Sequence, residues 1–226
     1  MPLEMIILEI IAYMLAWVIP LMWAQWMIQD PSRIAIIQKH RVFHPNTISY
    51  GRMLMAIPVI WLHSSGFVFA AIILFIIAAI SDAIDGIFAR GADLITDIGK
   101  IVDALGDKGL YLPILPYLFG FTSGIVLFIC IDIFSQISRR WLKKKNKSTA
   151  ANVWGKVKTT AVFILIGGQA ISERYNLELW SELVDIGIYI IIVLAICSVF
   201  FKFISPKTIP AFIRLKKNQL IDYAFK

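Results

Sequence analysis

The sequence has 226 residues, of which 59% are hydrophobic and 16% are charged, and its formal net charge is +7. The mean hydropathy is +0.77, whereas a soluble domain carries about a quarter charged residues. These values exclude an ordinary soluble enzyme and predict an all-α integral membrane protein that crosses the bilayer several times. We expect its basic segments to face the cytoplasm, and we expect no nucleic-acid partner.

The first hydrophobic run, residues 3–28, is expected to form a helix within an N-terminal segment of residues 1–29. Its length permits a membrane span with the N-terminus outside. Its tryptophans and its polar residues, such as Trp17 and Glu9, also suit a helix that lies at the interface. Both interpretations stay open. The run resembles an anchor more than a cleaved signal peptide, because it lacks a basic start and a small-residue cleavage site.

The rest of the chain divides by charge. Residues 30–45 are polar and basic and are predicted to be a cytoplasmic juxtamembrane segment, and residues 206–226 a basic cytoplasmic tail. A six-helix transmembrane domain is expected over residues 46–205. Its spans are predicted at 46–63, 66–90, 98–120, 122–141, 156–172 and 183–203. The alternation of basic and non-basic loops places residues 82–107 at the cytoplasmic ends of two successive helices.

The stretch "DAIDGIFARGADLITDIGKIVDALGD" carries four aspartates at helical spacing. Because a helix turns about 100° per residue, Asp82 and Asp85 share one arc, and Asp103 and Asp107 share one stripe on the next helix. Four carboxylates at a membrane surface repel one another and are costly to desolvate. A pair or trio of hard divalent cations, Mg²⁺ or Mn²⁺, would balance them through oxygen ligands.

Two other interpretations of the same aspartates remain open on spacing alone. The first is an interhelical ion-pair network with the basic residues nearby, Arg90, Lys100 and Lys108. The second is an ion or proton pathway, as in transporters, where intramembrane carboxylates are typical. A transporter would be a non-enzyme alternative for the whole chain.

The same stretch resembles the motif of the CDP-alcohol phosphotransferases, D-x2-D-G-x2-A-R-x8-G-x3-D-x3-D, at every fixed position. Each position would match by chance about one time in twenty, so all of them together are not an accident. The fixed positions are Asp82, Asp85, Gly86, Ala89, Arg90, Gly99, Asp103 and Asp107. The resemblance implies an enzyme with a six-helix membrane fold that forms homodimers. It would transfer a substituted phosphoryl group from a CDP-linked donor to an alcohol and release CMP.

The resemblance also implies a role for each matching residue. Asp82, Asp85 and Asp103 would bind the metal ions. Asp107 would complete the metal cluster and act as the general base on the acceptor hydroxyl, and Arg90 would contact the diphosphate. The remaining donor-binding positions implied are Asn46, Gly86, Ala89 and Gly99, together with Asp82.

Upstream, "HPNTISYGRML" resembles the P-N-x-x-T/S-x-x-R pattern at the start of the family's first core helix. The pattern places Asn46, Ser49 and Arg52. A polar helix start explains Asn46 as a cap but does not explain Arg52.

Two later segments bear on the acceptor. "NVWGKVKTTA" resembles the G-K-x-K-T segment of bacterial phosphatidylglycerophosphate synthases, and "SRRW" resembles their Arg-x-Trp. This resemblance implies CDP-diacylglycerol as the donor and sn-glycerol 3-phosphate as the acceptor. The cations expected to bind the acceptor phosphate are Arg139, Arg140, Lys156 and Lys158.

The chain departs from those synthases at three places. Ala104 stands where many have proline, "CID" at 130–132 leaves no arginine in the fourth core helix, and Val162 replaces a glutamine. Other acceptors therefore remain open: phosphatidylglycerol as in cardiolipin synthases, inositol phosphate, or serine. In each case we expect a multi-pass protein of the inner (cytoplasmic) membrane, surrounded by membrane lipid, with its active site facing the cytoplasm.

Overall fold

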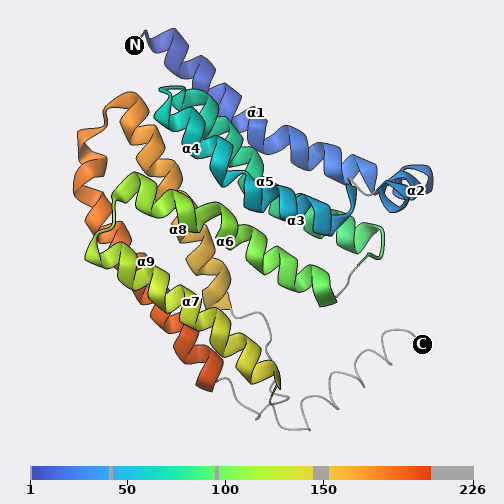
Figure 1. Ribbon diagram of the computed structural model, residues 1–226. Helices are drawn as coiled ribbons and strands as arrows, with labels where there is room; N and C mark the ends of the chain where they lie inside the picture. Colours follow the sequence, from blue (N-terminus) through green and yellow to red (C-terminus); the bar gives the residue numbers. More distant parts are fainter. Residues whose placement is uncertain (1, 41–42, 95–96, 145–152, 205–226) are drawn as a thin grey trace, which may run out of the picture.

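The computed structural model describes residues 2–40, 43–94, 97–144 and 153–204, and every regular element in these residues is a helix. The all-α prediction is confirmed. The helices, labelled in Figure 1, are α1 (Leu3–Met27), α2 (Pro31–Lys39), α3 (Pro45–Leu54), α4 (Ala56–Ser64), α5 (Val68–Gly91), α6 (Asp97–Phe119), α7 (Ser123–Lys144), α8 (Val153–Tyr175) and α9 (Glu178–Ile204).

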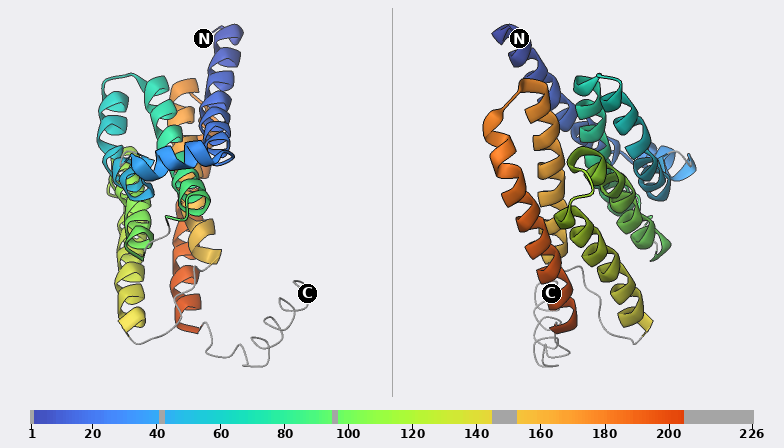
Figure 2. Two further views of the ribbon diagram at one scale, coloured as in Figure 1. Left: turned by 90° about the vertical axis from the view of Figure 1, so that its right-hand side faces the viewer. Right: turned by 60° about the vertical axis from the view of Figure 1, so that its left-hand side comes forward.

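The long helices share one general direction, as expected for a protein built into a bilayer (Figure 2). Within the described residues, three are long and apolar enough to cross a membrane by length and composition: Leu3–Met27, Val68–Gly91 and Leu183–Phe201. The other long helices carry more polar and charged side chains, and several of these build the site described below. The chain is therefore a membrane protein, and α1 is long enough to be one of its spans.

The segment 46–63, predicted as one span, is divided into two helices in the structure. α3 ends at Leu54 and α4 begins at Ala56, with Met55 between them. Pro58 supplies the physical reason, since a proline lacks an N–H and its ring clashes with the carbonyl four residues earlier, here that of Leu54. α3 consequently packs against α5 and α6 as a separate short helix.

The segment 30–45 contains a helix that the sequence analysis did not predict. α2 starts at Pro31 and is capped by Asp30, whose side chain accepts a hydrogen bond of 2.8 Å from the backbone N–H of Ser32. The hydrogen bonds from Ser32 lower the pKa of Asp30 below its usual value. α2 lies across the direction of the long helices (Figure 2, left). An Asp-Pro pair is a strong signal for a helix start, so this helix was readable from the sequence.

α1 packs along α5 and reaches α8. Near its C-terminal end, the Trp23 ring lies 5.7 Å from the ring of Phe88 in α5. Nearer its start, Glu9 pairs with Arg174 at 2.5 Å and accepts a hydrogen bond of 2.8 Å from Tyr175. A polar contact of this kind, within an otherwise apolar surface, fixes the rotation of α1 relative to α8.

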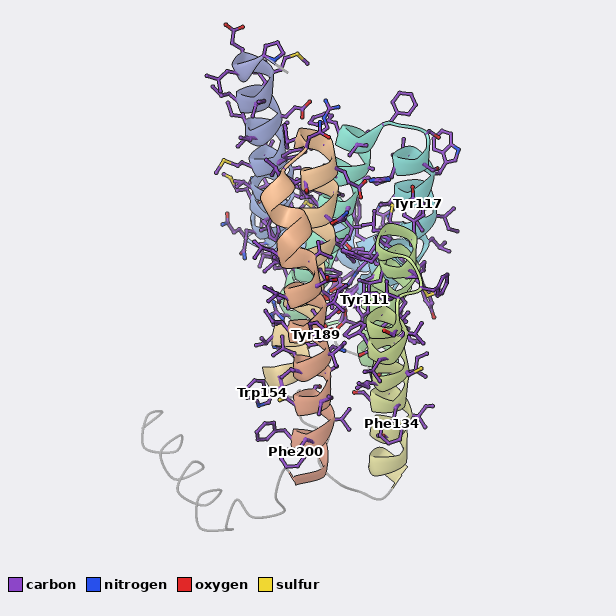
Figure 3. The ribbon with its side chains drawn as sticks, turned by 90° about the vertical axis from the view of Figure 1, so that its left-hand side faces the viewer. Tyr111, Tyr117, Phe134, Trp154, Tyr189 and Phe200 are labelled. Atoms are coloured by element: carbon purple, nitrogen blue, oxygen red, sulfur yellow. The ribbon has the colours of Figure 1, made fainter. Side chains whose placement is uncertain are left out.

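Several aromatic side chains pack against one another in the largely aliphatic core of the bundle. The ring of Tyr111 in α6 lies 6.2 Å from Phe163 in α8 and 6.3 Å from Phe128 in α7, and Phe75 in α5 lies 5.7 Å from Phe163. Figure 3 shows Tyr111 between α6 and α7 on one side and α8 and α9 on the other. Such tilted and edge-on pairs stabilise the packing beyond the area that they bury.

Candidate active site

The structure brings the four predicted aspartates together at facing ends of α5 and α6. We call Asp82, Asp85, Asp103 and Asp107 the aspartate cluster. Asp82 and Asp103 are about half exposed, with 48% of each side chain accessible, whereas Asp85 keeps only 7%. The cluster thus has an open face and a buried face.

The cation at the centre of the cluster is Arg52 from α3, and its side chain is completely buried. One terminal nitrogen of its guanidinium, Nη1, donates to Asp82 at 2.8 Å and to Asp107. The other, Nη2, donates to Asp85 and lies 3.4 Å from Asp103. A planar guanidinium is suited to this arrangement because it offers several N–H donors in fixed directions.

Arg52 therefore takes the place that the ion-pair interpretation gave to other residues. Among the described side chains, Lys108 turns away from the cluster and pairs with Asp132. Arg90 is exposed and lies over Gly86, where an added Cβ would be 3.2 Å from the nearer guanidinium nitrogen. The side chain of Lys100 lies outside the described residues.

Close contact between α3 and α6 allows Arg52 to reach the cluster. Gly106 lies between Asp103 and Asp107, and a Cβ added there would be 2.8 Å from the backbone oxygen of Ser49. Real Cβ atoms do not approach so closely, so only glycine permits this distance between the two backbones. Ser49 also donates a hydrogen bond of 2.8 Å to Asp85 through its hydroxyl.

The cluster fits a divalent metal ion. Asp82, Asp85 and Asp103 each offer one carboxylate oxygen, and these oxygens lie within 4.8 Å of one another. Hard cations such as Mg²⁺ and Mn²⁺ prefer an all-oxygen donor set of this kind. One guanidinium cannot neutralise four carboxylates, so the cluster keeps an excess of negative charge that a cation would balance.

A cavity of about 840 Å³ opens against the cluster. Asp82, Asp103 and Asp107 form part of its wall, and so do Trp17 of α1 and Tyr117 of α6. The rest of the wall consists mainly of aliphatic and aromatic side chains of α5, α6 and α8. A largely apolar cavity with charged groups on its wall suits an amphiphilic ligand.

Two lysines lie on the same cavity wall and share one buried carboxylate. We call Lys108 of α6 and Lys158 of α8 the lysine pair. Both line the cavity, and the ammonium group of each pairs with a different oxygen of Asp132 in α7. Asp132 is 0% exposed and also accepts a hydrogen bond of 2.8 Å from the Tyr111 hydroxyl.

The structure places the remaining predicted positions as follows. Lys156 is exposed and lines the cavity. Asn46 lies in the first turn of α3, where its backbone N–H donates to His44 at 3.3 Å. Ala89 and Gly99 are half-buried on α5 and α6. Their roles stay predictions, as do those of Arg139 and Arg140, whose side chains lie outside the described residues.

The sequence analysis missed the positions of Arg52 and Asp132 in the site. The signal for Arg52 was present, since helix capping left it unexplained in the "HPNTISYGRML" pattern. For Asp132, the signal was a lone acidic residue in the apolar run of α7. Such a residue is costly within a membrane unless it is paired, so it predicts partners on facing helices.

Comparison with known families gives a match over residues 42–204 to the model described as CDP-alcohol phosphatidyltransferase. The chain belongs to the CDP-alcohol phosphatidyltransferase family. The match begins just before α3 and ends with α9, so it includes all four aspartates and leaves α1 and α2 outside. The resemblance inferred from the sequence is confirmed. Members of this family use divalent metal ions, and the aspartate cluster contains an acidic group that could hold one.

The chain is similar to several proteins that share the name CDP-diacylglycerol--glycerol-3-phosphate 3-phosphatidyltransferase. The protein from Mycoplasma pneumoniae is 34% identical over 98 residues, which is 42% of this chain and 43% of the relative. The protein from Bacillus subtilis is 32% identical over 142 residues, which is 60% of this chain and 70% of the relative. The protein from Haemophilus influenzae is 29% identical over 116 residues, which is 48% of this chain and 62% of the relative. The match thus spans less than half of the first relative and about two thirds of the others.

Proposed function

We propose that this protein transfers the phosphatidyl group of CDP-diacylglycerol to sn-glycerol 3-phosphate, giving phosphatidylglycerophosphate and CMP. The observation that carries the proposal is one cavity with two charged groups on its wall, the aspartate cluster and the lysine pair. The cluster attracts cations and the pair attracts an anion. The names of the relatives agree with this choice of substrates.

On the donor side, the residues to hold the metal are Asp82, Asp85 and Asp103, with Asp107 beside them. Bound Mg²⁺ or Mn²⁺ would neutralise the diphosphate and the departing CMP phosphate. Arg90 lies one helical turn from Gly86 on the same helix and adds charge-assisted hydrogen bonds to phosphate oxygens. Gly86, Ala89 and Gly99 have no side chain larger than a methyl group, so the cytidine can approach the backbone there.

On the acceptor side, Asp107 takes the proton from the attacking hydroxyl. Asp107 lines the cavity and keeps 23% of its side chain exposed, so a hydroxyl can reach it. Its neighbour in the chain, Lys108, lines the same cavity and binds the acceptor phosphate together with Lys158. Holding the phosphate in this way orients the hydroxyl toward the base, which contributes more than the basicity of a carboxylate does.

The apolar part of the cavity accounts for a lipid donor. Its wall includes Phe75, Ile76 and Phe163. Apolar side chains at this position would contact the acyl chains while the diphosphate meets the aspartates. The lipid then does not have to leave the bilayer during the reaction.

We place the protein in the inner (cytoplasmic) membrane with the aspartate cluster facing the cytoplasm. The basic segment around α2 lies close to this end, where Gln38 donates a hydrogen bond of 3.0 Å to the backbone oxygen of Ala92, just beyond α5. Basic residues in short segments favour the cytoplasmic side. We further propose a homodimer, as the family resemblance implies.

The test is CMP release from CDP-diacylglycerol by the purified protein, with Mg²⁺ or Mn²⁺. The acceptors glycerol 3-phosphate, inositol phosphate, inositol, serine and phosphatidylglycerol are supplied in parallel. We expect release with glycerol 3-phosphate, loss of release in EDTA, and a product with the mass of phosphatidylglycerophosphate. Release with a different acceptor alone would overturn the choice of acceptor, and cation flux without CMP release would favour a transporter.

A matched pair of variants distinguishes loss of the metal site from a general loss of folded protein. Asp82→Asn removes a metal-binding carboxylate, and Asp185→Asn makes the same chemical change at an exposed position on α9, away from the cavity wall. Only Asp82→Asn is expected to reduce CMP release.

A further inference from the structure

Asp132 is a buried carboxylate that the mechanism above does not use. It lies in α7 between Ile131 and Ile133 and is 0% exposed. Burying an unpaired carboxylate costs on the order of several kcal/mol in desolvation free energy. The groups that pair with Asp132 must therefore offset this cost.

Three donors from two other helices surround this carboxylate. Lys108 donates to Oδ2 and Lys158 donates to Oδ1. The Tyr111 hydroxyl donates to Oδ2 at 2.8 Å. Asp132 thus joins α6 and α8, which both supply parts of the cavity wall, through a single side chain on α7.

The position of Asp132 relative to the cavity is informative. Among the described residues, the cavity wall includes Lys108 and Lys158 but not Asp132, so the carboxylate lies behind the two ammonium groups. Both ammonium groups also lie on the cavity wall, where an anionic ligand can contact them. Two neighbouring ammonium groups would otherwise repel each other, and a shared carboxylate holds them together.

We propose that Asp132 is a positioning residue that presents Lys108 and Lys158 as a paired anion site for the acceptor alcohol. This inference rests on the proposed function and gives Asp132 the task of arranging the two lysines that bind the acceptor. Because Lys108 follows Asp107 in the chain, an anionic group at the pair puts a neighbouring hydroxyl of the same molecule near the base. The site therefore selects small alcohols that carry an anionic group close to the reacting hydroxyl.

The experiment compares Michaelis constants for two substrates in one variant. Asp132→Asn keeps the size of the side chain and removes its charge. We expect its KM for glycerol 3-phosphate to rise by about tenfold or more, the usual loss for a charged hydrogen bond. The KM for CDP-diacylglycerol should change by less than about twofold, because the donor does not use this pair. Asp132→Glu, which restores the charge, should recover part of the acceptor affinity.

Two variants are controls, and a third replaces Asp132→Asn if that protein does not fold. Tyr111→Phe removes a neutral donor to Asp132 and leaves both lysines, so it should raise the acceptor KM less than Asp132→Asn does. Asp185→Asn should leave both constants unchanged. If Asp132→Asn does not yield folded protein, Lys108→Met decides instead, because it leaves Asp132 paired with Lys158 and must raise the acceptor KM.

Several outcomes would overturn the inference. An equal rise in both KM values would mean that Asp132 only supports the fold. A lower acceptor KM in Asp132→Asn would mean that the carboxylate competes with the acceptor phosphate. An unchanged acceptor KM in Lys108→Met would remove Lys108 from the site. A failure of the proposed function looks different, since wild-type protein would then release no CMP with glycerol 3-phosphate. If wild type prefers neutral inositol, both proposals fail.

Discussion

The aspartate cluster and the lysine pair are built in opposite ways. The cluster places four carboxylates around one guanidinium, and the pair places two ammonium groups around one carboxylate. In each site, the single counter-ion is the most deeply buried group. The side chains of Arg52 and Asp132 are both 0% exposed. Three of the four aspartates (Asp82, Asp103 and Asp107) and both lysines line the cavity.

Both sites present like charges to a ligand inside a membrane protein. A buried counter-ion behind these charges lowers the cost of holding them close together, while the charged groups themselves stay accessible to the substrate. The pair Glu9 and Arg174 contrasts with both, because one carboxylate meets one guanidinium between α1 and α8, away from the cavity wall. We therefore expect the aspartate cluster and the lysine pair to serve binding and catalysis and the pair Glu9–Arg174 to serve packing.

The largest expected effect comes from Asp107→Asn. The amide keeps the shape of the side chain but cannot accept the proton, so kcat should fall by about 10²–10⁴-fold, the usual contribution of a general base. Binding of CDP-diacylglycerol should persist, because the other three aspartates remain. CMP release and equilibrium binding of the donor measure the two effects, with Asp185→Asn as the control. Undiminished turnover would remove Asp107 from this role.

Arg52→Met removes the buried counter-ion of the cluster while keeping much of its volume. Asp85, which keeps only 7% exposure, then lacks its cation. Loss of one partner from a buried pair costs about 3–5 kcal/mol, so the thermal unfolding midpoint in detergent should fall. Added Mn²⁺ should raise that midpoint more in the variant than in wild type. An unchanged midpoint would show that Arg52 does not offset the charge of the cluster.

Gly106→Ala tests the approach of α3 to α6. The new methyl would lie 2.8 Å from the backbone oxygen of Ser49 and would push Arg52 away from the aspartates. Overpacking of this kind costs about 1–3 kcal/mol, and both the midpoint and CMP release should decrease. Gly51→Ala is the matched control, because nothing lies within 4 Å of its added Cβ. There, alanine should stabilise α3 slightly, and an equal loss in both variants would contradict the close approach.

Glu9→Gln should have the smallest effect. The amide loses the charge that pairs with Arg174 but retains an oxygen for the Tyr175 hydroxyl. Polar contacts between membrane helices contribute about 0.6 kcal/mol on average, so the unfolding midpoint should decrease slightly. The KM values for donor and acceptor should stay as in wild type. A selective change in either KM would give α1 a direct part in substrate binding.

Much of the site was predictable because it follows from helical spacing. The repeat that joins Asp82 to Asp85 and Asp103 to Asp107 places each pair on one helix face, and the short link between them brings the faces together. The position of Arg52 was not predictable in this way. It depends on which face of α3 meets α6, and that is decided by packing at Gly106 rather than by any local pattern.

The fold shows the same division between local and tertiary signals. All-helical structure and membrane class follow from composition, and the start of α2 follows from Asp30 and Pro31. The break between α3 and α4 was missed because hydrophobicity alone does not register Pro58, which a local rule would have found. The link of Asp132 to lysines on two other helices required the assembled bundle.

The most direct test of the account is a crossed titration of CMP release against Mg²⁺ and against glycerol 3-phosphate, in Asp82→Asn and Asp132→Asn. We expect Asp82→Asn to raise the Mg²⁺ concentration for half-maximal release and to leave the acceptor KM within about twofold of wild type. Asp132→Asn should do the reverse. If both constants move together in both variants, the two charged groups do not serve separate ligands, and the account is contradicted.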